Sequence, residues 1–193
     1  MPTTIQEFDA VRITNATVQF IKNKEKQPGI SFGCVGTIEG ETEMITVVKL
    51  CEGVEAKRKT KPTKMTMTVE AHIPVAVARS YFGLKEKYNN GIYTYGTDSI
   101  GDSFIFAADV IDDFEDVVKK IAFSNCTDNT GFKISMENGA DEVALLELEF
   151  TALPDEEKNI YYEAFVDELD DETIAAKWLK EFSTELAKGT PAP

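Results

Sequence analysis

The stretch MTMTVEAHIPVAVARSYFG, residues 65–83, changes its pattern at a single proline. Before Pro74 the apolar and polar residues alternate, which is typical of a strand with one buried face. Proline cannot donate a ladder hydrogen bond, and its fixed φ suits the first turn of a helix. The residues that follow have helical composition and stop at Gly83, where a left-handed cap is wanted. The sequence therefore predicts a strand over 65–73 and a short helix over 75–82.

Further strands are predicted on both sides of this stretch, because β-branched and aromatic runs alternate with turn residues. The expected strands cover 11–14 and 18–21 around a bulge or bend at Asn15-Ala16, 31–38 and 43–51 around a hairpin at 39–42, 103–111, 117–123, 131–136 after a turn-rich loop at 124–130, 142–152 and 160–166. About nine strands with few helices predict a mainly β fold. We expect an antiparallel β-sandwich or partly closed barrel with one short helix and one C-terminal helix.

The C-terminal helix is predicted over 171–188. Asp170 or Asp171 caps its start and Gly189 ends it. An apolar stripe recurs every four residues on it, which indicates a face that packs against the core. The members of the stripe are Ile174, Trp178, Phe182 and Leu186.

The segment 103–111 differs from the other strands because both of its faces are apolar. Such a strand is buried on both sides within one subunit or is covered by another subunit. The second interpretation makes five residues candidates for a subunit boundary: Phe104, Ile105, Phe106, Val110 and Ile111.

Charge is unevenly distributed along a chain whose net charge is −14. Residues 137–172 hold fourteen Asp or Glu against one Lys, whereas residues 57–64 hold five positive charges. The basic residues lie in a connection over 52–62 that is longer than a hairpin needs. Two interpretations remain open: solvated surfaces that keep the chain soluble, or a positive and a negative pole that meet between copies.

Length and composition predict one domain over residues 1–193, with a flexible tail at 189–193. For residues 1–30 both an N-terminal arm and a strand remain open. The three cysteines, Cys34, Cys51 and Cys126, form no CxxC pair, which predicts reduced and buried thiols in a cytoplasmic setting. We expect neither a membrane span nor a secretory signal, because no long apolar run is present.

Enzyme motifs are missing from the sequence. It has no GxSxG, HExxH or Walker loop and a single histidine, His72, so we expect neither catalytic residues nor a metal or cofactor. The alternative to a structural protein is a monomeric β-sandwich module that binds carbohydrate or another ligand. Its contact residues would be the tyrosines around an Asn-Gly turn, Tyr88, Tyr93 and Tyr95.

Several spaced blocks of the sequence resemble one known family. They are VEAHIP at 69–74, FGL at 82–84, GIYTYG at 91–96, IAFSNC at 121–126, DEVA at 141–144, YYEA at 161–164 and the helix around Trp178. Over roughly residues 44–186, their order and spacing resemble the major tail tube proteins of long-tailed (siphovirus-type) phages of Gram-positive bacteria.

The resemblance implies a virion protein that is assembled in the bacterial cytoplasm. Its subunits form hexameric rings that stack into a tail tube, the conduit for DNA ejection, together with a tape measure protein and other tail proteins. DNA would pass the lumen without specific binding. In such a tube the two charge poles become inter-ring contact candidates: Lys57, Arg58, Lys59 and Lys61 on one side and Asp155, Glu156 and Glu157 on the other.

Overall fold

The computed structural model describes residues 4–134 and 145–189. Its strands are β1 (Arg12–Lys22), β2 (Glu25–Lys26), β3 (Ile30–Ser31), β4 (Cys34–Cys51), β5 (Val54–His72), β6 (Lys85–Glu86), β7 (Tyr93–Thr94), β8 (Ser103–Asp112), β9 (Val117–Asp128), β10 (Leu146–Ala152) and β11 (Tyr161–Phe165). Its helices are α1 (Val75–Tyr81), the 3₁₀ turn η1 (Val166–Glu168), α2 (Glu172–Trp178) and α3 (Thr184–Ala187). None of these helices is long and apolar enough to cross a membrane.

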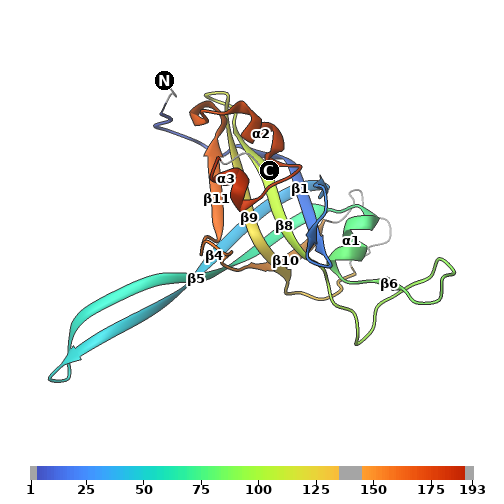
Figure 1. Cartoon of the computed structure of the whole chain (residues 1–193), viewed down its shortest axis with the longest axis horizontal. Coiled ribbons are helices and arrows are strands. Elements are labelled where there is room, and N and C mark those ends of the chain that lie inside the picture. The colour runs from blue at the N-terminus through green and yellow to red at the C-terminus, as the bar shows by residue number, and fades with distance from the viewer. Residues whose placement is uncertain (1–3, 135–144, 190–193) are drawn as a thin grey trace.

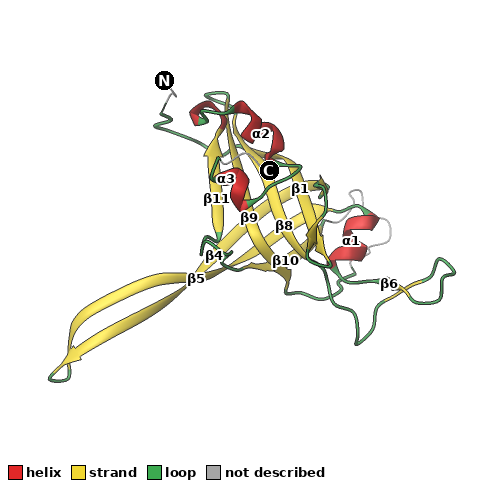
Figure 2. Ribbon diagram, in the orientation of Figure 1, coloured by secondary structure: helices red, strands yellow, loops and turns green. Residues whose placement is uncertain are grey.

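One antiparallel sheet of nine strands forms the body (Figure 2). Its order is β2-β1-β8-β9-β10-β5-β4, β3 pairs with β1, and β11 pairs with β9. β10 and β11 share one edge of β9, because β10 pairs with its end near Asp128 and β11 with the part around Phe123. The sheet does not close into a barrel. The predicted mainly β, antiparallel fold is confirmed.

The strand and helix around Pro74 form as predicted. β5 alternates buried and less buried residues up to Ala71, and α1 follows directly after Pro74. Gly83 has φ +68°, and a Cβ at this position would lie 2.3 Å from the carbonyl oxygen of Ile100. Only glycine fits a position that combines a left-handed backbone with such close contact. The bulge in β1 is also confirmed, because the register with β8 shifts between Thr14 and Thr17.

The larger core lies on the face of the sheet that α1 covers. All the long strands except β4 and β11 contribute buried residues to it, and α1 contributes Val77 and Tyr81. Aromatic rings dominate its centre, where Phe104, Phe106 and Phe150 are fully buried and the ring of Phe150 packs against both of the others. Rings at these separations and tilts add to the stabilisation from burial alone.

A second, smaller core lies on the opposite face of the sheet. Ile105 and Ala107 of β8 pack there against Trp178 and Phe182 of the C-terminal segment. The indole N–H of Trp178 donates to the carbonyl of Ile121 at 3.1 Å. The burial of Trp178 and Phe182 was predicted, but the single helix over 171–188 was wrong. The chain forms two short helices, because Ser183 is extended and its side chain caps α3 instead.

Both faces of β8 are therefore covered within one subunit. Phe104 and Phe106 face the larger core and Ile105 faces the smaller one, all three with at most 1% exposure. Their assignment to a subunit boundary was wrong, since the C-terminal segment supplies the cover that was expected from a neighbour. Val110 and Ile111 are half-buried and pair with Ile13 and Arg12 of β1.

Four other predictions need correction, and one open alternative is decided. The hairpin at 39–42 is the middle of the continuous strand β4, and the loop at 124–130 is largely the end of β9. Residues 12–30, left open as an arm or strand, contribute β1, β2 and the first residue of β3 to the sheet. Of the predicted buried thiols only Cys126 is buried, whereas Cys34 and Cys51 are exposed. The strand predicted over 131–136 is not formed at 131–134. Three predicted segments lie outside the described residues: the end of that strand at 135–136, the start of the strand predicted over 142–152, and the tail beyond Gly189.

Candidate assembly surface

A long two-stranded ribbon projects from the body (Figure 1). β10 pairs with β5 as far as Met65, and on the other side of this residue, towards Val54, β4 is the only described strand that pairs with β5. At about 3.3 Å per residue, the segment of β4 from Met44 to its end at Cys51 spans roughly 23 Å. Such a ribbon is only marginally stable by itself in water, so its position suits a contact with another protein.

The ribbon corrects the prediction of a long basic loop over 52–62. Those residues form the returning strand β5, and only Glu52 and Gly53 connect it to β4. Glu52 has φ +53° and Gly53 φ +81°, the left-handed pair that a two-residue hairpin turn requires. The basic residues therefore have fixed positions along a ladder.

The two faces of the ribbon follow from its register. Residues directly opposite each other in an antiparallel pair share a face, and successive residues alternate between faces. Met44, Thr46 and Val48 therefore share a face with their partners Pro62, Thr60 and Arg58, and Leu50, opposite Glu55, continues this face. Ile45, Val47 and Lys49 share the other face with Lys61, Lys59 and Lys57.

The first face, which we call the neutral face, has no unpaired charge among these residues. Arg58 forms a two-pronged ion pair with Glu55 at 2.8 and 2.9 Å, and the hydroxyls of Thr46 and Thr60 are 3.0 Å apart. Met44 is 53% exposed and Val48 is 40% exposed. Exposed apolar side chains in a contiguous group are typical of a protein–protein contact.

The second face, which we call the lysine face, carries four ammonium groups. They belong to Lys49, Lys57, Lys59 and Lys61, and none of them has an ion-pair partner among the described residues. Lys49 and Lys57 are direct cross-strand partners, an arrangement that like charges make unfavourable. An acidic surface of a partner would relieve this repulsion.

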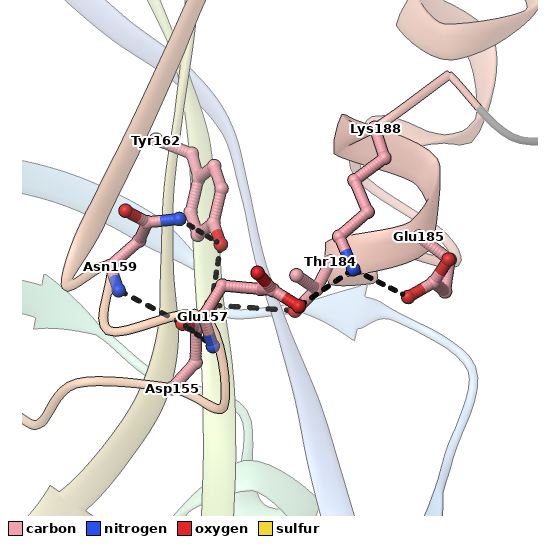
Figure 3. A network of polar contacts seen from close by, with 7 residues as sticks. All are labelled: Asp155, Glu157, Asn159, Tyr162, Thr184, Glu185 and Lys188. Atoms are coloured by element: carbon pink, nitrogen blue, oxygen red, sulfur yellow. Dashed lines mark hydrogen bonds and ion pairs between the residues drawn. The ribbon is translucent and has the colours of Figure 1, made fainter.

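The acidic candidates lie at the turn between β10 and β11, and most are already engaged within the chain (Figure 3). The carboxylate of Asp155 accepts hydrogen bonds from the hydroxyls of Tyr162, Ser124 and Thr184. It also accepts from the backbone N–H groups of Glu157 and Asn159, both at 2.9 Å. Asp155 thus fastens the turn and α3 to the sheet.

These contacts determine the charge state of Asp155. Burial acts to raise its pKa, but the hydrogen bonds from Tyr162, the two backbone groups and Ser124 outweigh burial and hold the pKa below its usual value. Glu157 pairs with Lys188 at 2.8 Å, and this contact raises the pKa of the lysine. Among the three predicted acids, only Glu156 has no hydrogen-bond or ion-pair partner in the described part of the chain. It lines a cavity of about 550 Å³ together with Phe182 and Glu185.

The structure does not bring the basic and acidic candidates together within one chain. No ion pair joins any of Lys57, Arg58, Lys59 or Lys61 to the turn at 155–157 among the described residues. Sequence reasoning found the charges but missed the exposed apolar side chains of β4. Their signal was the apolar and β-branched run MITVVKL at 44–50, whose partner strand was not recognised.

The tyrosines of the alternative ligand-binding interpretation do not form an open platform. Tyr93 stacks on the guanidinium of Arg79 at 3.6 Å, and Tyr95 packs against Phe132 with ring centres 5.4 Å apart. Only Tyr88, which is 66% exposed, lacks such a ring contact in the described residues.

Comparison with known proteins gives little beyond the fold. Neither a protein-family model nor a curated protein matches the sequence. Among solved structures, this chain is similar to one described as the anti-feeding prophage cap (AFP tube terminating cap), determined by cryo-EM. The match has 9% identity and a TM-score of 0.44, and it covers 84% of this chain and 95% of the other.

Proposed function

We propose that this chain is a structural subunit of a phage tail tube. Copies form hexameric rings, the rings stack through the ribbon, and viral DNA passes through the lumen. The partners are further copies, a tape measure protein and other tail proteins, and the location is the virion after assembly in the bacterial cytoplasm. The ordered sequence blocks over 44–186 support this proposal, and the single structural observation that carries it is the exposed ribbon.

The ribbon supports a heterologous contact between copies. It extends from one end of the molecule (Figure 1), and we place its contact on a different surface of the neighbouring copy. Contacts between two different surfaces do not close on themselves and build filaments. Six copies at each ring junction would add their individually weak contacts, because binding at linked sites is cooperative through effective concentration.

The two faces contribute differently to this contact. Complete burial of an apolar side chain such as Val48 or Leu50 stabilises by about 1.5–3 kcal/mol. An exposed ion pair stabilises by at most about 1 kcal/mol, so Lys57, Lys59 and Lys61 contribute less individually. Exposed apolar side chains lie on both faces, Met44 and Val48 on the neutral face and Ile45 and Val47 between the lysines, and together they supply most of the affinity. The lysine face meets acids such as Glu156 of the next ring and fixes the register.

The acidic composition suits a lumen that DNA must traverse. A basic groove gains affinity for phosphates by releasing counterions, whereas a chain with net charge −14 does not. The proposal accordingly places the lysine face in the protein contact and away from the DNA.

The test is assembly of the purified protein, followed by sedimentation and negative-stain electron microscopy. Wild type should form rings or tubes. The double variant Val48→Glu/Leu50→Glu should remain as folded single subunits or single rings. Phe114→Glu is the matched control, because Phe114 is 78% exposed at the β8–β9 turn and lies outside the ribbon.

A second variant tests the lysine face. Lys57→Glu/Lys59→Glu/Lys61→Glu should shorten the tubes, and high salt should reduce the difference from wild type, because salt screens exposed charges. Arg58 is left unchanged because its partner Glu55 belongs to the same ribbon. Dispersed wild-type monomers in every condition, or equal tubes from all variants, would refute the proposal.

A further inference from the structure

A cationic pocket lies at the side of α1, in a chain that is otherwise strongly acidic. It is a cavity of about 510 Å³ between the end of β1, the last turn of α1 and the loop that carries β6 and β7. Lys22, Arg79 and Lys85 line it, with Asp102 as the acidic residue of the lining. The lining therefore carries a net charge of +2, three positive groups against one negative group.

Arg79 is held in a fixed orientation at this site. Its guanidinium carbon lies 3.6 Å from the centre of the Tyr93 ring. Stacking on one face leaves the N–H groups at the edge free to donate in the plane of the guanidinium. No carboxylate of the described residues forms an ion pair with Arg79. The geometry thus presents a preorganised donor fork that has no acceptor.

The two lysines are anchored beside it. The ammonium group of Lys22 lies 3.1 Å from the hydroxyl of Ser80 and 3.6 Å from Asp102. Lys85 donates to the carbonyl of Asp98 at 3.3 Å. Each ammonium group has three protons, so each keeps donors for a further acceptor.

The backbone that lines the pocket is fixed by a hydrogen bond and by close packing. The backbone N–H of Asp102 donates to the carbonyl of Ser80 at 3.0 Å, and Gly83 fits tightly beneath Ile100. Ile100 is 77% exposed at the rim, beside the half-buried Leu84. Apolar groups around a few convergent polar donors are typical of a site that binds an anionic group attached to an apolar chain.

The same molecule exposes a segment with complementary charge. Residues 166–172, VDELDDE, connect β11 to α2 and hold five carboxylates. No Lys or Arg of the described residues pairs with these acids. The backbone N–H of Ile5 donates to Glu168, and Asp171 caps α2, while Asp167 and Asp170 are exposed. We call this segment the acidic bend.

The acidic bend and the cationic pocket lie apart from each other on one subunit, since the bend leads into α2 and the pocket adjoins α1 (Figure 1). We propose that the cationic pocket binds carboxylates of the acidic bend of a second copy of this chain. The contact is heterologous, and it forms a closed ring when the rotation between copies permits. This inference rests on the proposed ring assembly for the source of the second copy.

A free phosphate or a nucleic acid fits the observations less well. Three cations in a chain of net charge −14 give no extended positive track for a polyanion. A peptide carboxylate beside an apolar residue such as Leu169 matches both the donors and the apolar rim.

The direct test uses a synthetic peptide of residues 165–174, capped at both ends and labelled with fluorescein. Fluorescence anisotropy at low salt should show binding to the full-length protein, and a peptide with all five acids replaced by their amides should not bind. Arg79→Gln and Lys85→Gln should each weaken binding about tenfold, because each removes a charge-assisted hydrogen bond. Lys26→Gln, an exposed lysine outside the pocket, should bind as wild type does.

Self-association gives an independent readout. Arg79→Glu should abolish ring formation in sedimentation velocity, and adding Asp170→Arg to the same chain should restore it by reversing both charges. Equal binding of the acidic and amide peptides, unchanged binding by Arg79→Gln, or displacement of the peptide by inorganic phosphate at comparable concentration would overturn the inference. Peptide binding that persists when wild type forms no rings would refute the proposed function but leave the pocket intact.

Discussion

Trp178→Ala tests whether the C-terminal segment belongs to the folded subunit. The indole is 3% exposed, packs on Phe182 with ring centres 4.8 Å apart, and covers Ile105 and Ala107. Removing a buried aromatic side chain costs about 3–5 kcal/mol when the cavity does not collapse. The variant also leaves the carbonyl of Ile121 without its donor, which costs about a further 1 kcal/mol.

The loss expected for Trp178→Ala is therefore about 4–6 kcal/mol, a large part of the stability of a typical domain. Urea unfolding followed by far-ultraviolet circular dichroism measures it, since the chain has one tryptophan and the variant loses its fluorescent probe. Trp178→Phe is the control. It keeps most of the apolar volume and loses the hydrogen bond, so its cost should be about 1–2 kcal/mol.

The result that would refute this reasoning is a loss below about 1 kcal/mol for Trp178→Ala, with the slope of the unfolding transition unchanged. The smaller core would then contribute little to the free energy of unfolding. The face of β8 that carries Ile105 would then not be firmly covered within one subunit. That face would again be a candidate for a contact between copies.

Three further predictions concern single positions. The pKa of Asp155 is lowered in the folded state, so the contribution of its carboxylate to stability is complete above about pH 4, the unfolded value. This contribution is lost as the pH falls through the lower folded value. Asp155→Asn should therefore flatten the pH dependence of urea unfolding in that range. In the native protein a maleimide should label the two exposed cysteines but spare Cys126, because burial raises the pKa of that thiol; mass spectrometry counts the labels, and three labels without denaturant would contradict the burial. Gly83→Ala should destabilise by about 1–3 kcal/mol in thermal unfolding, through its left-handed backbone and the close carbonyl of Ile100, whereas Gly91→Ala, with open space around it, should cost less.

Local patterns predicted those elements whose cause is local. The strand before Pro74, the helix after it and the stop at Gly83 depend on the backbone chemistry of single residues, and each is found in the structure. The bulge near Asn15 belongs to the same class, as does the cap of α2, where Asp171 accepts from Thr173 at 2.8 Å. These features can be predicted because no distant part of the chain is needed to form them.

The ribbon could not be predicted in this way. Residues 52–62 are polar, basic and interrupted by Pro62, which is the composition of a loop. They form a strand because they pair with β4 along its outer half. The sequence of a strand does not show which other segment it pairs with. The glycine at 40 shows the same effect: a Cβ there would lie 2.5 Å from the sulfur of Met67, so Gly40 permits close strand packing where a turn was expected.

The candidate site likewise has features that depend on single residues and features that depend on contacts between distant segments. The sequence by itself determined the charges of Lys57, Lys59 and Lys61 and of the acids at 155–157, because charge is a property of the residue. Only the tertiary structure decided that the lysines share one face, that Asp155 is already engaged, and that the C-terminal segment covers β8. Those outcomes depend on register and on contacts between segments far apart in the chain, and a shift of one residue in register would exchange the two faces of the ribbon.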